Sequence, residues 1–195
     1  MKYFFLGATV LVTLLSACNN GSTDKTATGT ADSTAKTAVT PDTTAASTAA
    51  QRSRIKGVVA GYLAMKNALT GDDDKGAAAA GDAIVKDLDR MDTTGLTAEQ
   101  SKTLADVKDD MRENAEHIGK SAGKIAHQRE HFDMLSQDMV KLVKTFGAGQ
   151  TLYDDHCPMY NHNKGADWLS EIKEIKNPYL GKAMPTCGSQ KEELK

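Results

Sequence analysis

Sulfur-containing side chains are concentrated near the C-terminus of the chain. Cys157 and Met159 belong to a Cys-Pro-Met sequence, and Met184 lies three residues before Cys187. Thiolate and thioether sulfurs are the ligands that Cu(I) prefers, and the proline restricts the backbone of the first motif. The spacing therefore predicts a site for a soft metal ion, chiefly Cu(I), with these four residues as ligands. Zinc is the alternative if imidazole nitrogens dominate the ligand set.

Two histidines upstream have a spacing that suits metal binding. His127 and His131 enclose the sequence Gln-Arg-Glu, so on a helix both imidazoles lie on one face. Some zinc peptidases use the same His-x-x-Glu-His pattern, but they need a third ligand and a large domain that positions the substrate. We expect no enzymatic activity, and we assign His127 and His131 to the metal site of the sulfur ligands. His156 and His162 flank the Cys-Pro-Met turn and are candidates to substitute for them.

The two C-terminal cysteines have a second interpretation. In an exported protein, an even number of cysteines is typically paired in disulfides, because the compartment is oxidising. A disulfide between Cys157 and Cys187 encloses about thirty residues and stabilises the folded state by about 3–4 kcal/mol. In that case the domain is a disulfide-stabilised protein-interaction module without metal. The sequence leaves both interpretations open.

The N-terminus predicts export and lipid attachment. Residues 1–18 contain a lysine, a short apolar run and the sequence Leu-Ser-Ala-Cys. This is the form of a lipoprotein signal peptide that ends in a lipid-modified cysteine, here Cys18. Asn19 is not the aspartate that retains lipoproteins in the inner membrane of enteric bacteria. We expect an outer-membrane lipoprotein, held to the membrane by its N-terminal lipid and facing the periplasm or exposed on the cell surface.

Composition separates a tether from a folded domain. Residues 19–52 are rich in Thr and Ala and contain Val39 as their one large aliphatic residue, so they are predicted to be a disordered tether. Residues 53–195 have the size of one domain. The formal net charge of −2 gives no basic face for nucleic acid, so we expect none as a partner.

The apolar residues of the domain recur at helical rather than alternating spacing. They predict an all-α fold, an antiparallel four-helix bundle in which Gly71 ends the first helix, Asp72 caps the second, Thr97 begins the third and Gly147 ends the fourth. The Pro-, Gly- and Asn-rich residues 149–195 are predicted to form a loop-rich cap. We expect one short helical piece there, near residues 167–175, with Trp168 in the core, and no sheet.

One pattern offers an alternative to the bundle. Six apolar residues lie seven apart, which also fits a single helix over residues 97–146. They are Leu104, Met111, Ile118, Ile125, Phe132 and Met139. Such a helix is about 75 Å long, far longer than a small domain can cover, so we favour a break near Gly119 to Gly123. An antiparallel hairpin at this break places His117 at the same end as His127.

Several segments together resemble the domain-of-unknown-function 3347 family. The resemblance runs from about residue 55 to the C-terminus, and the joint order of the segments makes it specific. The segments are Tyr-Leu-Ala-Met-Lys-Asn-Ala-Leu at 62–69, Glu-His-Ile at 116–118, His-Gln-Arg-Glu-His-Phe at 127–132, Leu-Ser at 135–136, Cys-Pro-Met at 157–159, Trp-Leu-Ser at 168–170, Asn-Pro-Tyr-Leu-Gly-Lys at 177–182 and Cys-Gly at 187–188.

The resemblance implies heavy-metal handling. Members of the family are exported lipoproteins or are joined to periplasmic adaptor subunits of heavy-metal efflux pumps. Their Cys-Pro-Met turn is also similar to the Tyr-Thr-Cys-Pro-Met-His of heavy-metal-binding domains, but here Tyr160 replaces the histidine and His156 precedes the cysteine. We predict a membrane-anchored periplasmic lipoprotein that binds Cu(I) for sequestration or for transfer to an efflux adaptor or metallochaperone.

Overall fold

The computed structural model describes residues 43–195. The predicted signal peptide, the lipid-modified Cys18 and the predicted tether up to residue 42 lie outside the described residues. The elements in chain order are α1 (Thr43–Thr70), α2 (Asp74–Asp89), α3 (Ala98–Gly119), α4 (Ile125–Phe146), β1 (Leu152–Cys157), α5 (Tyr160–Asn163), β2 (Ala166–Ser170), the 3-10 helix η1 (Gly181–Ala183) and β3 (Ser189–Leu194). Residues 43–52, the end of the predicted tether, are helical because α1 begins at Thr43.

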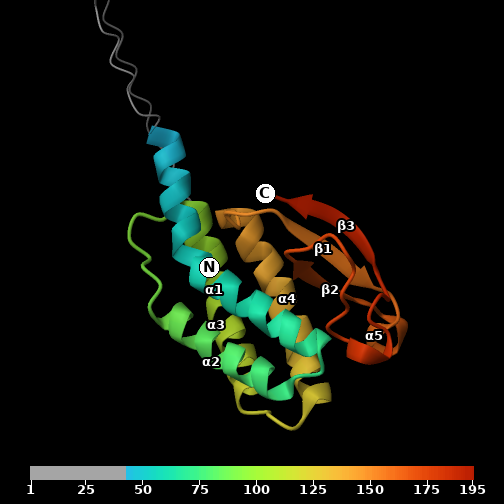
Figure 1. Cartoon of the computed structure of the whole chain (residues 1–195). Coiled ribbons are helices and arrows are strands. Elements are labelled where there is room, and N and C mark those ends of the chain that lie inside the picture. The colour runs from blue at the N-terminus through green and yellow to red at the C-terminus, as the bar shows by residue number, and fades with distance from the viewer. Residues whose placement is uncertain (1–42) are drawn as a thin grey trace, which may run out of the picture. The chain divides into compact units, whose positions relative to one another are not determined.

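The first four helices pack side by side. Each of α1, α2 and α3 contacts the next helix in the chain, and α4 also contacts α1. Figure 1 shows the small sheet beside α4, and β2 is the strand that packs on this helix. The prediction of four helices is therefore confirmed, with a sheet added to them. In the described part of the chain, none of the helices combines the length and the apolar character needed to cross a membrane.

Local signals at the helix ends explain most of the boundaries. Thr97 and Gln100 form the predicted capping box, in which each side chain accepts a hydrogen bond from the other residue's backbone N–H. The predicted Asp72 cap is wrong: Asp73 caps α2 by accepting a hydrogen bond from Gly76 N. Asp72 has a positive φ of 55° in the turn, and its carboxylate instead pairs with Arg129 of α4 at 2.6 Å.

A chain reversal separates α3 from α4, as the glycines predict. α3 ends at Gly119, and Gly123 has a φ of 86°, which L-residues with a side chain rarely adopt. Gly123 N donates a hydrogen bond to the Asp74 carboxylate at the start of α2, so the reversal also contacts α2. The single long helix is excluded. The seven-residue spacing of apolar residues continues through both helices because each helix buries its apolar stripe in the same core.

The cap contains a three-stranded antiparallel sheet in the order β2-β1-β3, so the all-α prediction is wrong in this region. The short helix predicted near residues 167–175 is also wrong, because residues 166–170 form β2. In β1, Leu152, Asp154, Asp155 and Cys157 are all buried, so no polar and apolar alternation marks the strand. β3 lies at the edge and is almost entirely exposed, which explains its polar sequence.

A tyrosine hydroxyl joins the helices to the sheet. Tyr62 of α1 is fully buried, and its oxygen lies 2.7 Å from Ser136 Oγ of α4. The same oxygen accepts a hydrogen bond from the backbone N–H of Leu169 in β2. Trp168 is also fully buried, as predicted, and its ring meets Tyr179 edge-on with centroids 6.0 Å apart.

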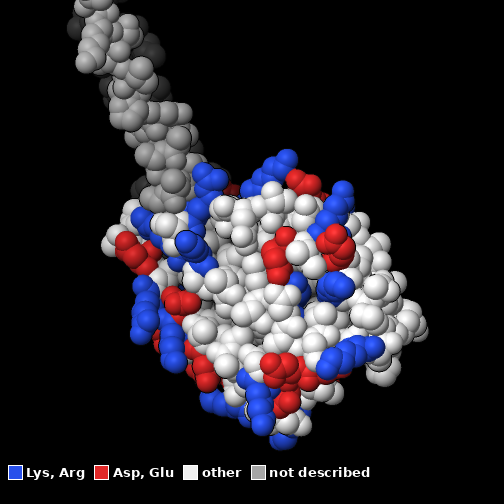
Figure 2. All heavy atoms as spheres, in the orientation of Figure 1, with Lys and Arg blue, Asp and Glu red and all other residues white. Residues whose placement is uncertain are grey.

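Charged side chains are interspersed by sign on the viewed face of the domain. Figure 2 shows Lys and Arg next to Asp and Glu, with uncharged residues between them. Ion pairs at the surface of the domain include Lys144 of α4 with Glu192 of β3 at 2.6 Å. Pairs of this exposed kind contribute little to stability, so the buried contacts hold the sheet to the helices.

The close approach of α2 and α3 requires a glycine, which generates a first prediction. A Cβ at Gly81 would lie 2.5 Å from the carbonyl oxygen of Ala115 and 3.0 Å from Gly119 N. Because both contacts are backbone atoms, we expect Gly81→Ala to lower the free energy of unfolding by about 2 kcal/mol or more. The measurement is urea denaturation. Gly71→Ala is the matched control, since its Cβ meets nothing closer than 3.5 Å, and an equal loss in both variants would contradict the packing argument.

A buried carboxyl group generates a second prediction. Asp155 of β1 is fully buried, and neither of its side-chain oxygens has a hydrogen-bond partner in the protein. Burial, and then the charge of Asp154, raise its pKa to about 7, against a smaller opposite effect of Lys66. The folded state thus holds a proton that the unfolded state releases near pH 4, so stability falls as pH rises from 4 to above 7.

We expect Asp155→Asn to remove this pH dependence, because the amide cannot ionise. The stability of the variant relative to the parent protein should grow by on the order of 2–3 kcal/mol between pH 5 and pH 8. Urea denaturation at the two pH values measures the difference. A constant difference at both would show that Asp155 is already ionised in the folded protein at pH 5.

Candidate metal centre

Three histidines meet at the reversal between α3 and α4. His117 lies in the last turn of α3, and His127 and His131 lie in the first two turns of α4. One ligand atom from each histidine can be chosen so that all three atoms lie within 4.8 Å of one another. This group, the histidine cluster, confirms that His117 falls at the same end as His127. The predicted break between α3 and α4 was the sequence signal for this cluster, because the chain reversal brings His117 close to His127 and His131.

The three rings face one another closely. The rings of His117 and His131 are stacked with centroids 4.4 Å apart, and the ring of His127 meets that of His131 edge-on at 4.6 Å. Tetrahedral zinc, with Zn–N bonds of about 2.0–2.1 Å, needs nitrogens about 3.3 Å apart. Because the ligand atoms lie within 4.8 Å of one another, ring rotations that shorten these distances by up to about 1.5 Å would bring the nitrogens onto one ion.

Hydrogen bonds set the tautomer of His131. Its Nδ1 lies 2.9 Å from Asn114 Oδ1. The Asn114 amide nitrogen donates to the carbonyl oxygen of Asp110 at 2.9 Å, so the amide oxygen is the atom that faces the imidazole. An amide oxygen only accepts, and Nδ1 of His131 must therefore carry the proton. This leaves the Nε2 lone pair of His131 for a metal ion, an outer-sphere arrangement typical of metal-binding histidines.

The other two histidines are more exposed and more loosely held. His127 Nδ1 lies 3.2 Å from a Glu130 carboxylate oxygen, which favours a proton on Nδ1 and a free Nε2. His117 Nε2 lies 3.8 Å from Glu113, too far for a hydrogen bond. The side chains of His117 and His127 are 49% and 44% exposed. The cluster is thus open to solvent on one side.

The environment favours the neutral, metal-binding form of His131. Partial burial is the largest effect that lowers its pKa below the ordinary value, followed by the positive charge that His117 and His127 acquire on protonation. Metal ions bind the neutral imidazole and compete with protons for it. A lowered pKa therefore leaves the nitrogen available at neutral pH.

The predicted sulfur ligands lie in the cap. The Sγ atoms of Cys157, at the end of β1, and Cys187, just before β3, are 3.6 Å apart, and both thiols are free. Cys157 is fully buried, whereas Met159 and Met184 are 49% and 40% exposed. Partial burial, and then the adjacent Cys157, raise the pKa of the Cys187 thiol.

The structure divides four of the six predicted ligands into two groups. His127 and His131 gather with His117, and among the described residues this cluster includes neither cysteine nor any carboxylate. Cys157 and Cys187 form the other group. His156, proposed as a substitute ligand, has its Nδ1 2.6 Å from the Asp167 carboxylate across the β1–β2 pair. Binding of metal by either group stays a prediction.

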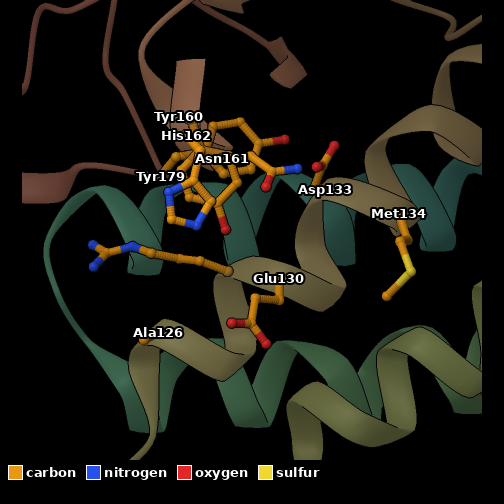
Figure 3. A pocket seen from close by; sticks show the side chains of 9 residues that line it. Ala126, Glu130, Asp133, Met134, Tyr160, Asn161, His162 and Tyr179 are labelled. Carbon is orange, nitrogen blue, oxygen red and sulfur yellow. The ribbon is translucent and has the colours of Figure 1, made fainter. Parts of the chain in front are cut away.

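A cleft of about 530 Å³ lies next to the histidine cluster. Figure 3 shows side chains of α4, including Glu130 and Asp133, opposite Tyr160, His162 and Tyr179 of the cap. Glu130 is common to the cleft and to the hydrogen bond with His127. The cap side of the cleft is built on a left-handed turn, because Asn161, His162 and Asn163 have φ values of 52°, 56° and 63°.

Comparison with known proteins identifies the family of the helical region. Residues 58–151 match the family described as "Protein of unknown function (DUF3347)". The predicted family is thereby confirmed over the helices that carry the histidine cluster. The matched segment ends before the Cys-Pro-Met turn, so the predicted resemblance of the cap lies outside it. Neither the curated proteins nor the solved structures contain a match.

The electrostatics of the cluster generate a third prediction. We expect the imidazole of His131 to titrate below the ordinary histidine pKa, and its pKa to rise in His117→Gln and in His127→Gln, because each variant removes a neighbour that becomes positively charged. NMR titration of the ring protons measures each pKa. His162→Gln, which changes a histidine outside the cluster, should leave the pKa of His131 unchanged. A His131 pKa insensitive to all three variants would mean that the rings are not neighbours in solution.

Proposed function

We propose that this protein of the DUF3347 family binds a divalent transition-metal ion through the histidine cluster, and that it handles heavy metal at the cell envelope. The observation that carries the proposal is the convergence of three imidazoles whose ligand atoms lie within 4.8 Å of one another. The hydrogen bond from His131 Nδ1 to Asn114 supports it, because it leaves Nε2 of His131 unprotonated.

The ligand type points to the class of metal. Three neutral imidazoles suit borderline ions such as Zn²⁺ and Cu²⁺, whereas Cu(I) prefers sulfur. Zinc, the alternative to Cu(I) in the sequence-based prediction, therefore fits the histidine cluster better. Among first-row divalent ions Cu²⁺ binds nitrogen ligands most tightly, so it should bind with the highest affinity. The Cu(I) site predicted at the cap sulfurs remains a separate prediction.

The exposure of the site favours transport over catalysis. His117 and His127 are nearly half exposed, so an ion bound there is accessible to a partner that takes it over. Among the described residues, the cleft that Glu130 lines and the cleft that His131 and Asn114 line are both open to solvent. We propose sequestration or hand-off of the ion rather than a reaction, with an efflux adaptor or metallochaperone as the receiving protein.

The cellular setting follows from the N-terminal sequence. The Leu-Ser-Ala-Cys motif ending in Cys18 supports attachment to the outer membrane through lipid, with the domain facing the periplasm or the cell exterior. The domain that carries the site would be an antiparallel four-helix bundle with its cap. A tether between the lipid and the bundle would let the metal site approach a membrane-bound partner.

Metal titration of the purified protein tests the proposal and is the fourth prediction. We expect one Cu²⁺ or Zn²⁺ per chain, measured by calorimetry against a competing chelator, and loss of tight binding in His117→Gln, His127→Gln and His131→Gln. His162→Gln is the matched control and should bind like the parent protein. Unchanged affinity in all three cluster variants would rule out the cluster as the metal site.

Asn114 provides a finer test of the same site. Asn114→Leu removes the acceptor of the His131 proton and should weaken binding 10–100-fold. Asn114→Asp keeps an acceptor in the same place and should bind at least as tightly as the parent protein. Equal weakening in both variants would show that the residue acts through packing instead of through the tautomer of His131.

A further inference from the structure

The two cap cysteines form a thiol pair that the histidine cluster does not use. Their sulfurs are 3.6 Å apart, and the described residues place no third His, Cys, Asp or Glu close enough to complete a metal site with them. A disulfide bond is about 2.05 Å long, so the sulfurs need to approach by about 1.5 Å. Side-chain rotation covers such a distance without a change of fold.

The backbone on both sides of the pair is held in place. Cys157 ends β1, and the adjacent register pairs His156 with Ser189, the first residue of β3 and two residues after Cys187. Cys187 is fixed through its carbonyl oxygen, which accepts a hydrogen bond from the side chain of Asn177 at 2.6 Å. Asn177 is fully buried, and its N–H donates to Pro185 O. The two cysteines are therefore held near each other whether or not their sulfurs are bonded.

The two thiols differ in their access to solvent. Cys187 is partly exposed, whereas Cys157 is fully buried. A reagent in solution can therefore reach Cys187 first, and Cys157 can react only with what Cys187 carries. This is the division of roles between an attacking and a resolving cysteine.

We propose that Cys157 and Cys187 are a redox-active pair that closes to an intramolecular disulfide by exchange with an organic disulfide. In the first step the Cys187 thiolate attacks one sulfur of the organic disulfide, the S–S bond breaks, and one thiol leaves with a proton. In the second step the Cys157 thiolate attacks Cys187 Sγ and releases the second thiol. The protein loses two electrons and two protons, and the organic disulfide gains them as two thiols.

Disulfide formation restrains the segment that lines the cap side of the cleft. The chain between the two cysteines contains α5, β2 and Tyr179, which supply the contact of the cap with α4 and the cap side of the cleft. The disulfide removes conformations from the unfolded chain that the open pair allows. The oxidised protein should therefore hold this segment more firmly than the reduced protein, independently of metal at the histidines.

The test, a fifth prediction, equilibrates the full chain with mixtures of reduced and oxidised glutathione in the presence of EDTA, followed by alkylation and peptide mass mapping. We expect Cys157 and Cys187 to become protected together, with the loss of two hydrogens and no bound glutathione. The Tm of the oxidised protein should rise by about 10 °C. Mapping by peptide keeps Cys18 separate from the pair.

Single variants separate the roles of the two thiols. Cys157→Ser should trap one glutathione on Cys187, and Cys187→Ser should leave Cys157 unmodified, because it is buried. Circular dichroism checks the fold, and Cys157→Ala replaces Cys157→Ser if the serine variant does not fold. Stable glutathione on Cys187 of the parent protein, or independent alkylation of both thiols at every glutathione ratio, would overturn the proposal. So would thiols that become protected only when EDTA is left out, because that result means metal binding.

Discussion

Helix α4 has to bury more than one face at the same time, and this constraint organises the domain. One side of it packs against α3 and α1, and another side receives β2 of the sheet. Phe132 illustrates the arrangement, because its ring stacks on Tyr62 of α1 at 5.1 Å and also meets Tyr179 of the cap at 5.6 Å. A helix covered in this way keeps only a narrow exposed strip, and His127 lies on it.

The histidine cluster depends on a turn as much as on the helices. Residues between Gly119 and Ile125 reverse the chain, and without the reversal His117 and His127 would lie about 15 Å apart along one helix. Gln128 holds the turn from inside, because its side-chain nitrogen donates to the carbonyl oxygens of Asp74 and Ile118. Buried backbone carbonyl groups need such partners, and a glutamine in α4 provides them. The residues that build the turn thus also determine the distance between the histidines.

The helical half of the fold was predictable because its signals are local. The Thr97 capping box and the glycine that ends α4 each act within one turn of the helix that they bound. The sheet was not predictable in the same way. Asp154 and Asp155 are buried polar residues inside β1, and the stability of that strand comes from pairing with residues far along the chain.

The site was predictable only in part for a similar reason. The spacing of His127 and His131 indicates a shared helix face, and the break indicates that His117 joins them. The hydrogen bond between Asn114 and His131 depends on how α3 packs against α4, so the residue spacing within one helix does not predict it. The sulfur ligands were chosen by their chemical type. Type alone does not reveal that Cys157 is buried within the cap, where it is grouped with Cys187 and not with the histidines.

Glu130 belongs to two neighbouring sites, and this has a thermodynamic consequence. Its carboxylate accepts from His127 while it also lines the cleft between α4 and the cap. A cationic molecule that draws the carboxylate into the cleft leaves the imidazole of His127 free to rotate. Occupancy of the cleft and occupancy of the histidines are then coupled through one side chain. Linkage requires the coupling to be mutual, so an ion on the histidines changes the affinity of the cleft by the same factor.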